Sequence, residues 1–192
     1  TGRGMVEQSV QRSAGDRLVR RALRMLLPWP ARFAPLLRMG QFVRPLLPAT
    51  LKQHVPEKQF SNQTAPAPQH ARIMLLLDGC VQPSLAPQIN HATVRVLDAL
   101  GITALSETNS GCCGAVSYHL NAVDEARTFM RTNIDAWWPA IEKGAEAIIV
   151  TASGCAPLVK DYGRLLAADS VYADKAKRVS ELARDISEII TA

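Results

Sequence analysis

The chain has 192 residues, an apolar fraction of 47% and a formal net charge of +5 at pH 7. This length allows one domain with a real core and a smaller appendage. The four cysteines, two of them adjacent, make a poor disulfide framework, and no apolar run approaches the ~20 residues that a membrane-spanning helix needs. We therefore expect a reducing, cytoplasmic setting in which the thiols are reserved for metal.

The positive charge is concentrated in the first part of the chain. Residues 1–72 carry 12 Lys and Arg against 3 Asp and Glu, a balance of +9, whereas residues 73–192 carry 10 against 14, a balance of −4. This division argues against a core that binds nucleic acid. It leaves the basic part as a surface for a protein partner, an anionic membrane or an anionic substrate.

Residues 1–54 are predicted to form a basic arm of short helices broken by proline, the first of them starting near Asp16. Two similar phrases, LLPWP and RPLLP, flank residues 31–43. The apolar side of that segment would consist of Phe33, Leu36, Leu37 and Phe42. Two interpretations stay open: a helix lying on a membrane surface, and an arm packed by its apolar side on a neighbouring domain. The short, proline-bounded pieces favour the packed arm.

The remaining chain divides into a linker at residues 55–71, rich in Pro, Gln and Ala, and a domain at residues 72–192. In the domain, apolar runs alternate with amphipathic segments. The expected strands are Ile73–Leu77, Ile102–Leu105 and Ala147–Val150; the expected helices run from Pro87 to Leu100, from a cap at Asn121 past Trp137, from Cys155 to Leu166, and from Ala173 to Ile190. This alternation predicts an α/β fold, a parallel sheet with helices on both faces.

All four cysteines fall where a predicted strand gives way to a helix. Cys80 ends LLLDGC, Cys112 and Cys113 lie in SGCCG, and Cys155 ends TASGC. Ligands of parallel sheets bind at the carboxyl ends of the strands, so these loops should converge on one site. The spacings, 31 residues between Cys80 and Cys112 and 41 between Cys113 and Cys155, fit no zinc-ribbon, cubane-ferredoxin or thioredoxin-like pattern. We interpret the site as one iron–sulfur centre assembled from separate loops.

Other residues near the cysteines are candidates for supporting roles. Glycines flank the cysteines and should let the backbone approach a metal closely: Gly79, Gly111, Gly114 and Gly154. His119 could contact an anionic substrate, tune a cluster through a hydrogen bond, or simply pack. Structural roles are the preferred interpretation for His91, Lys160, Tyr162, Trp137 and Trp138.

The cysteine pattern resembles a known family, the cysteine-rich CCG domain. That domain occurs in heterodisulfide reductase subunits, lactate-utilisation proteins, anaerobic glycerol-3-phosphate dehydrogenase and glycolate oxidase. The iron–sulfur subunits of glycolate oxidases are the members that this chain resembles in particular. The phrases that carry this likeness are LLLDGCVQPSLAPQINHATVRVLDALGI, CCGAVSYHLNAVDEARTFMRTNIDAWW and IIVTASGCAPLVKDYG, together with the proline-rich arm.

The resemblance implies an electron-transfer role. It implies that residues 72–192 are the first of two CCG repeats, in a middle fragment of a subunit whose ferredoxin-type motifs precede it. It also implies that Cys80, Cys112, Cys113 and Cys155 hold a [4Fe–4S] cluster. The electrons would come from a flavin-binding partner subunit with FAD, which oxidises glycolate to glyoxylate, and pass toward a membrane or quinone acceptor. This chain alone would not be catalytic, and it would lie in the cytoplasm or peripherally on the inner face of the cytoplasmic membrane.

One position departs from the family pattern. The fullest CCG motif ends in C-x-x-C and supplies five cysteines to a noncubane cluster, but the first of those two positions is Ala152 here. The cluster type is therefore open between an ordinary cluster, an altered one, zinc, and no stable metal. Two other functions stay open as well: a redox protein of the lactate-utilisation or heterodisulfide-reductase type, and a structural or assembly module.

Overall fold

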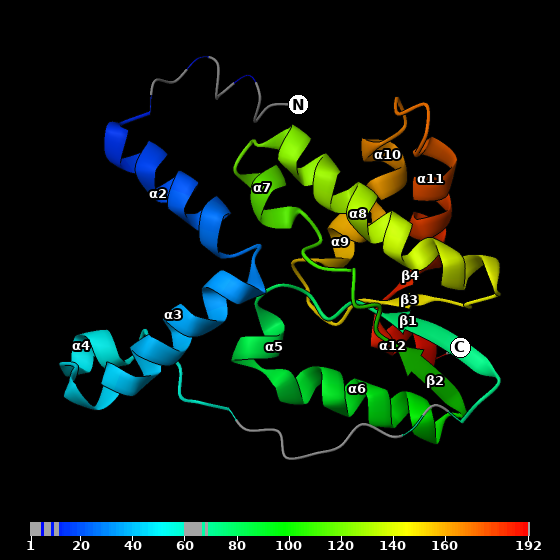
Figure 1. The fold of residues 1–192 in the computed structure, drawn as a ribbon, viewed down its shortest axis with the longest axis horizontal. Helices are drawn as coiled ribbons and strands as arrows, with labels where there is room; N and C mark the ends of the chain where they lie inside the picture. Colours follow the sequence, from blue (N-terminus) through cyan, green and yellow to red (C-terminus); the bar gives the residue numbers. More distant parts are fainter. Residues whose placement is uncertain (1–4, 6–8, 10–11, 60–66, 68, 192) are drawn as a thin grey trace.

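Four parallel strands form the centre of the structure, a computed structural model that describes residues 5, 9, 12–59, 67 and 69–191 (Figure 1). The strands are β1 (Arg72–Leu76), β2 (Ile102–Leu105), β3 (Ile148–Ile149) and β4 (Ala183–Arg184), in the order β2-β1-β3-β4. The register of the β1–β2 pair runs from Arg72 opposite Ile102 to Leu75 opposite Leu105. The α/β fold with a parallel sheet is thereby confirmed.

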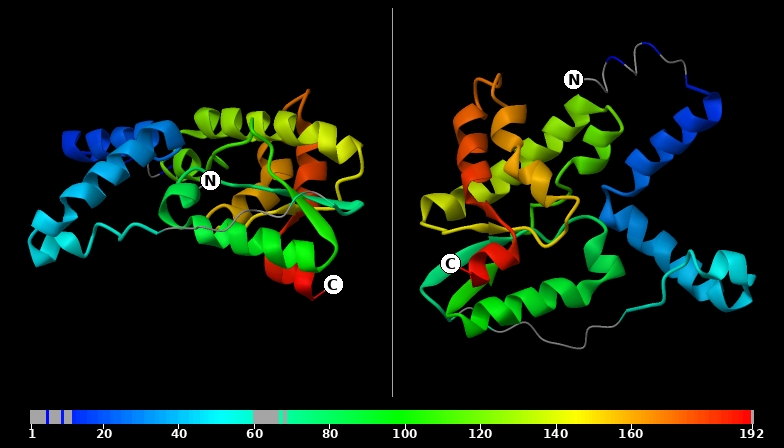
Figure 2. Two further views of the ribbon diagram at one scale, coloured as in Figure 1. Left: turned by 60° about the horizontal axis from the view of Figure 1, so that its bottom comes forward. Right: turned by 180° about the vertical axis from the view of Figure 1, so that it is seen from behind.

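Helices cover both faces of this sheet, because successive side chains of each strand point to opposite sides. Leu75 and Ile148 belong to a larger core, which is covered by α8 (Val123–Glu142), α9 (Ala156–Lys160), α10 (Tyr162–Leu165) and α11 (Ala173–Leu182). Leu76 and Ile149 belong to a smaller core, which is covered by α6 (Pro87–Ala99) and α12 (Ile186–Ile190) (Figure 2). Two short helices, α5 (Gln82–Leu85) and α7 (Ala115–His119), follow the first two cysteine loops.

The prediction of one helix from Ala173 to Ile190 is wrong. The segment is divided into α11, the edge strand β4 and α12. Val150 donates its N–H to the carbonyl of Arg184 at 2.9 Å, so pairing with the sheet overrides the local helix propensity. Asp185 then starts α12 in a capping box with Glu188.

The apolar pattern of residues 87–100 predicts an inward side made of Ile89, Thr93, Val96, Leu97 and Leu100, and this prediction is partly wrong for α6. Thr93 and Leu97 are buried as expected, but Ile89, Val96 and Leu100 are exposed. The third buried residue is a polar one, Asn90. The helix is therefore rotated about its axis relative to the orientation that the apolar pattern predicts. The hydrogen bonds of Asn90 with Asp78, Gln82 and Thr151 account for this orientation.

The basic arm consists of α2 (Ala14–Leu26), α3 (Pro30–Val43), the 3₁₀ turn η1 (Arg44–Leu46) and α4 (Ala49–Lys52). It contacts the domain near the corner between α2 and α3. There Arg24 donates to Glu125 of α8, with Nη2 to Oε2 at 2.5 Å, and the rings of Trp29 and Phe129 meet edge to face at 5.6 Å. The remainder of the arm extends away from the sheet (Figure 1). None of its described helices is long and apolar enough to cross a bilayer.

The apolar side predicted for residues 31–43 is only partly covered. Phe33 and Leu37 are half-buried, whereas Leu36 is 44% and Phe42 84% exposed. The packed-arm interpretation therefore holds for the corner but not for the far end of α3. Much of the predicted linker at 55–71 lies outside the described residues.

The ion pair between Arg24 and Glu125 should make the docking of α2 depend on pH. The hydrogen bond from Arg24, helped by one from Ser117, holds the pKa of Glu125 below its ordinary 4.5. A carboxyl group with a lowered pKa contributes stability above its ordinary pKa and loses it as the pH falls through the folded-state value. Because both side chains are about one-third exposed, the pair contributes about 1 kcal/mol.

We expect Glu125→Gln to lower the hydrogen-exchange protection of the α2 amides about fivefold at pH 7, since a lone helix of 13 residues is marginal in water. At pH 3 the variant and the unmodified chain should converge. Glu142→Gln, at the exposed end of the same helix α8, is the matched control and should leave α2 unchanged. Equal protection in all three proteins at pH 7 would show that the ion pair does not hold the arm.

Candidate functional site

The structure places all four cysteines beyond the carboxyl ends of the strands. Cys80 follows β1, the pair Cys112–Cys113 directly precedes α7, and Cys155 is the N-cap of α9 after β3. Their side chains lie close enough for each thiol to shift the pKa of a neighbour: Cys80 and Cys112 interact, as do Cys112 and Cys113, and Cys113 and Cys155. The three loops thus converge as the sheet topology predicts. Whether the cysteines are ligands stays a prediction.

Burial and mutual contact raise the pKa values of three of these thiols. For Cys80 the main cause is the hydrogen bond with Cys112, followed by desolvation. For Cys112 the hydrogen bond with Cys113 raises the pKa to about 12, although the one with Cys80 opposes it. For Cys113 the bond with Cys112 lowers the pKa, but contact with Cys155 and burial outweigh it. In this arrangement the thiols keep their protons at neutral pH, so a metal must displace those protons when it binds.

The chemistry of the donor set fits an iron–sulfur cluster. Cys80, Cys112 and Cys113 are at most 8% exposed, and Cys155 is half-buried. Within the described ranges, no three His, Cys, Asp or Glu side chains surround a point where one metal ion could sit. The four candidate donors are all cysteine thiols, and an all-thiolate donor set is what iron–sulfur clusters use, as four-cysteine zinc sites also do.

A buried asparagine of α8 holds the loop that carries the cysteine pair. Asn133 is 1% exposed. Its Oδ1 accepts the N–H of Gly111 at 2.8 Å, and its Nδ2 donates to the carbonyl of Cys112 at 2.9 Å. One side chain thus satisfies a donor and an acceptor of a loop that has no strand partner there.

Tyr162 of α10 holds the next residue of the same loop. Its hydroxyl donates to the carbonyl of Cys113 at 2.8 Å and lies 3.3 Å from Nδ2 of Asn133. Complete burial raises the pKa of Tyr162, so the hydroxyl stays a neutral donor. The interpretation of Tyr162 as a core residue is correct for its burial, but its contact with the cysteine loop was not foreseen.

A second polar cluster joins the first and third cysteine loops. The amide of Asn90 in α6 donates to Asp78, with Nδ2 to Oδ1 at 3.1 Å. Its Oδ1 accepts from Gln82 at 2.5 Å and from Thr151 at 2.9 Å. Asp78 and Gln82 flank Cys80, and Thr151 lies four residues before Cys155. Asn90 therefore fixes the distance between two loops that are far apart in sequence.

Sequence reasoning missed both asparagines, although a signal existed for one of them. Asn133 lies on the helical face that also carries Ala126, Met130 and Trp137, so it is a polar residue within an apolar stripe. A polar side chain in that position must find buried partners. Asn90 gave no such signal, because the apolar pattern of α6 indicated a different inward side.

The four flanking glycines differ in what they require. Gly114 has φ +90°, and a Cβ there would stand 2.9 Å from the carbonyl oxygen of Ala126 in α8. Glycine is thus needed for a close approach to a helix, not only to a metal. Its N–H also lies 3.4 Å from Sγ of Cys112. At the other three positions a Cβ would meet nothing within 4 Å, and the role near a metal stays a prediction for Gly79, Gly111 and Gly154.

The remaining candidate residues differ in their burial and in their contacts. His119 is exposed at the end of α7 with its ring edge toward Tyr118, and its proposed role stays a prediction. His91 is half-buried in α6. Lys160 is exposed and pairs with Glu188 at 2.6 Å, as expected for a surface residue. Trp137 is fully buried, and Trp138 lies beneath the ammonium group of Lys175.

Comparison with known proteins agrees with this geometry. Residues 74–160 match the family described as "CCG: Cysteine-rich domain", and this range contains all four cysteines. Residues 74–160, which contain the β-strand, cysteine loop and helix units described above, are therefore a cysteine-rich domain of the CCG family. No solved structure gives a significant match.

The more specific resemblance is confirmed as well. The chain is 49% identical over 189 residues to the glycolate oxidase iron-sulfur subunit of Escherichia coli, covering 98% of this chain and 46% of that protein. It is 25% identical over 112 residues to a probable glycolate oxidase iron-sulfur subunit of Bacillus subtilis, covering 58% of this chain and 24% of that protein. Lactate utilization protein A of Anoxybacillus flavithermus is 27% identical over 111 residues, with 58% and 44% covered. The chain thus spans less than half the length of these relatives.

The close approach at Gly114 leads to a stability prediction. Gly114→Ala should be strongly destabilising, because the new methyl group meets backbone atoms of α8 in addition to adopting an unfavourable φ. Gly101→Ala is the matched control, since Gly101 has φ +73° but open space around the Cβ position. In urea unfolding, Gly114→Ala should cost about 2 kcal/mol more than the control. Equal losses would mean that α8 yields and that only φ matters.

The hydrogen bond from Tyr162 leads to a second stability prediction. Tyr162→Phe leaves the buried carbonyl of Cys113 without its donor, which should cost about 1–3 kcal/mol in urea unfolding. Tyr172→Phe is the control, because the hydroxyl of Tyr172 donates to Asp135 at 2.7 Å at an exposed site. That variant should change the free energy of unfolding by less than about 0.5 kcal/mol. A similar small loss in both variants would contradict the role of Tyr162 in holding the loop.

Proposed function

We propose that this chain is the cysteine-rich part of an iron–sulfur subunit that transfers electrons in a glycolate-oxidising complex. The observation that carries the proposal is the group of Cys80, Cys112, Cys113 and Cys155 at one edge of the sheet, inside the matched CCG domain. The 49% identity to a glycolate oxidase iron-sulfur subunit supports the choice of complex. The chain itself contributes ligation and electron transfer, and the substrate is oxidised elsewhere.

The four thiolates would hold the cluster, which supplies one-electron redox chemistry when bound. The residues of this chain determine its surroundings. Asn133 and Tyr162 hold the backbone of the cysteine pair, so the two sulfur atoms keep one orientation. The N–H of Gly114 points at Sγ of Cys112, a contact of the kind that raises a cluster's reduction potential by stabilising negative charge on sulfur.

Ala152 bears on the type of cluster. Its carbonyl accepts the N–H of Cys155 at 2.9 Å, so it stands one turn before that cysteine. A fifth thiol at this position would complete the noncubane motif, and its replacement by a methyl group leaves four sulfur donors. We therefore favour a four-cysteine [4Fe–4S] cluster over the noncubane form.

The electron path and the location complete the proposal. Electrons would arrive from a partner subunit that holds FAD and leave toward a quinone or another acceptor at the membrane. The thiols would be kept reduced on the cytoplasmic side, with the complex in solution or peripherally attached to the inner face of the membrane. The exposed apolar residues of α3, such as Met39 and Phe42, are consistent with a surface that a larger assembly covers.

A second candidate function is lactate oxidation. It is favoured by the 27% identity to lactate utilization protein A, although over only 58% of the chain. The two candidates predict different electron donors. In the assembled complex, glycolate should reduce the cluster faster than lactate, as followed by the loss of visible absorbance under anaerobic conditions, and the reverse order would favour the second candidate.

The metal content tests the site itself. After anaerobic reconstitution, iron and acid-labile sulfide should each approach ~4 per chain, with an electron paramagnetic resonance signal in the reduced sample. Cys112→Ser and Cys155→Ser should lose most of both. Ser153→Ala, at the exposed position two residues before Cys155, is the control and should keep them.

Zinc without sulfide, or well-folded protein without any metal, would refute the cluster in this chain. The structural or assembly module would then be the better description. Retention of iron and sulfide in Cys155→Ser alone would instead show that the third loop is not part of the site.

A further inference from the structure

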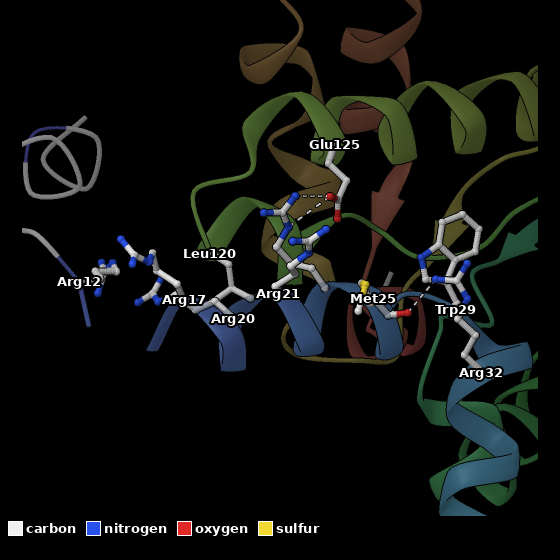
Figure 3. A pocket seen from close by; sticks show the side chains of 10 residues that line it. Arg12, Arg17, Arg20, Arg21, Met25, Trp29, Arg32, Leu120 and Glu125 are labelled. Carbon is white, nitrogen blue, oxygen red and sulfur yellow. Dashed lines mark hydrogen bonds and ion pairs between the residues drawn. The ribbon is translucent and has the colours of Figure 1, made fainter. Parts of the chain in front are cut away.

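Arginines line a hollow between the basic arm and the part of the domain formed by α7 and the start of α8. The hollow has a volume of about 720 Å³, and α2, the first residues of α3, α7 and α8 surround it (Figure 3). Six arginines contribute to its lining: Arg12, Arg17, Arg20, Arg21, Arg24 and Arg32. The guanidinium groups from α2 lie on the side of the helix that faces Leu120 and Glu125 (Figure 3).

The negative charge around this hollow does not match the positive charge. Asp16 takes Arg12 and Arg20 as partners, and Glu125 takes Arg24. Arg17 and Arg21 have no ion pair among the residues that the structure describes, and both are exposed. Two adjacent cations are therefore held toward a hollow whose carboxylates are already engaged. Such a surface attracts anions and is relieved of self-repulsion when one binds.

The spacing of the arginines suits an extended anion. Arg17, Arg21 and Arg24 follow one another at four and three residues on α2, so they form a row about 10 Å long on one face. A compact anion would meet only one or two of them. Glu125 already demonstrates the binding mode, because one of its oxygens accepts from both Nε and Nη2 of Arg24, at 3.2 and 2.5 Å.

The surroundings of the row favour a polypeptide over a bilayer or a nucleic acid. The arginines line a hollow, which a flat bilayer could not enter. Met25, Trp29 and Leu120 provide apolar wall next to the cations, which suits a segment that alternates acidic and apolar side chains. A phosphate backbone could pair with the arginines, but it carries no aliphatic side chains that would cover Met25 and Leu120.

We propose that this hollow is a docking site for an acidic segment of a partner polypeptide, whose carboxylates pair with Arg17 and Arg21 and whose apolar side chains contact Met25 and Leu120. The proposal is independent of the metal that the cysteines hold. It gives the arm a second contact function beyond its own attachment to α8 through Arg24.

Binding of a defined peptide to the full chain tests the proposal. The probe is a fluorescein-labelled peptide of 12 residues with six glutamates, two leucines and four serines, followed by fluorescence anisotropy. The Arg17→Gln/Arg21→Gln variant should bind it about tenfold more weakly. The Arg95→Gln/Lys177→Gln variant removes the same charge from exposed positions outside the hollow and should change the affinity less than twofold.

Three results would overturn the proposal. The first is equal weakening in both variants, because the peptide would then respond only to net charge. The second is equal binding of a peptide with glutamine in place of each glutamate. The third is an absence of peptide binding, whether or not vesicles of phosphatidylglycerol and phosphatidylcholine, tripolyphosphate or single-stranded DNA bind in its place. Unfolding midpoints should be measured for both variants, so that the binding comparison is made between folded proteins.

Discussion

The burial of the loop that carries Cys112 and Cys113 beside α8 is the constraint on which this structure depends. A loop that carries Cys112 and Cys113 into the interior leaves its backbone without a strand or helix partner, and buried polar groups without partners are costly. Asn133 and Tyr162 remove that cost by pairing with Gly111, Cys112 and Cys113 in turn. Gly114 then lets the chain pass within contact distance of α8. The loop is held from one side, so the sulfur atoms are directed toward the loops after β1 and β3.

The parts of this arrangement that could be predicted from the sequence are those set by local pattern and topology. Continuous apolar runs identify β1 and β2, and the parallel order then brings the ends of β1, β2 and β3 to one edge. The convergence of the cysteines follows from that alone. Pattern could not locate β4, because two residues of strand between helical segments carry no periodicity. It also placed α6 in the wrong rotation, since the three hydrogen-bonded partners of Asn90 decide its orientation and lie on other segments.

The residues that support the cysteine loop could not be predicted from the sequence, for a related reason. A glycine beside a cysteine suggests room for a metal, yet Gly114 is required by the backbone of a helix that begins nine residues later. The sequence predicts an ordinary core residue at Tyr162, because nothing in VKDYG indicates that its hydroxyl faces the cysteine pair. Polar residues that satisfy a distant loop depend on tertiary packing, and a single sequence shows them only where they interrupt an apolar stripe, as Asn133 does.

Helix α8 connects the two functional regions that the structure indicates. Near its start, Glu125 binds Arg24 of the arm and accepts from Ser117 of α7 at 2.6 Å. Eight residues later, about 12 Å along the axis, Asn133 holds the cysteine loop. Ser117 itself is fully buried and follows the cysteine pair by four residues, so the arm is attached to the same short segment that carries the thiols. A partner bound in the arginine hollow would therefore rest on the two helices that hold the cysteine loop, and not on a separate part of the molecule. Under the proposed electron-transfer function, this shared support would keep the proposed docking surface and the sulfur site in a constant relative position.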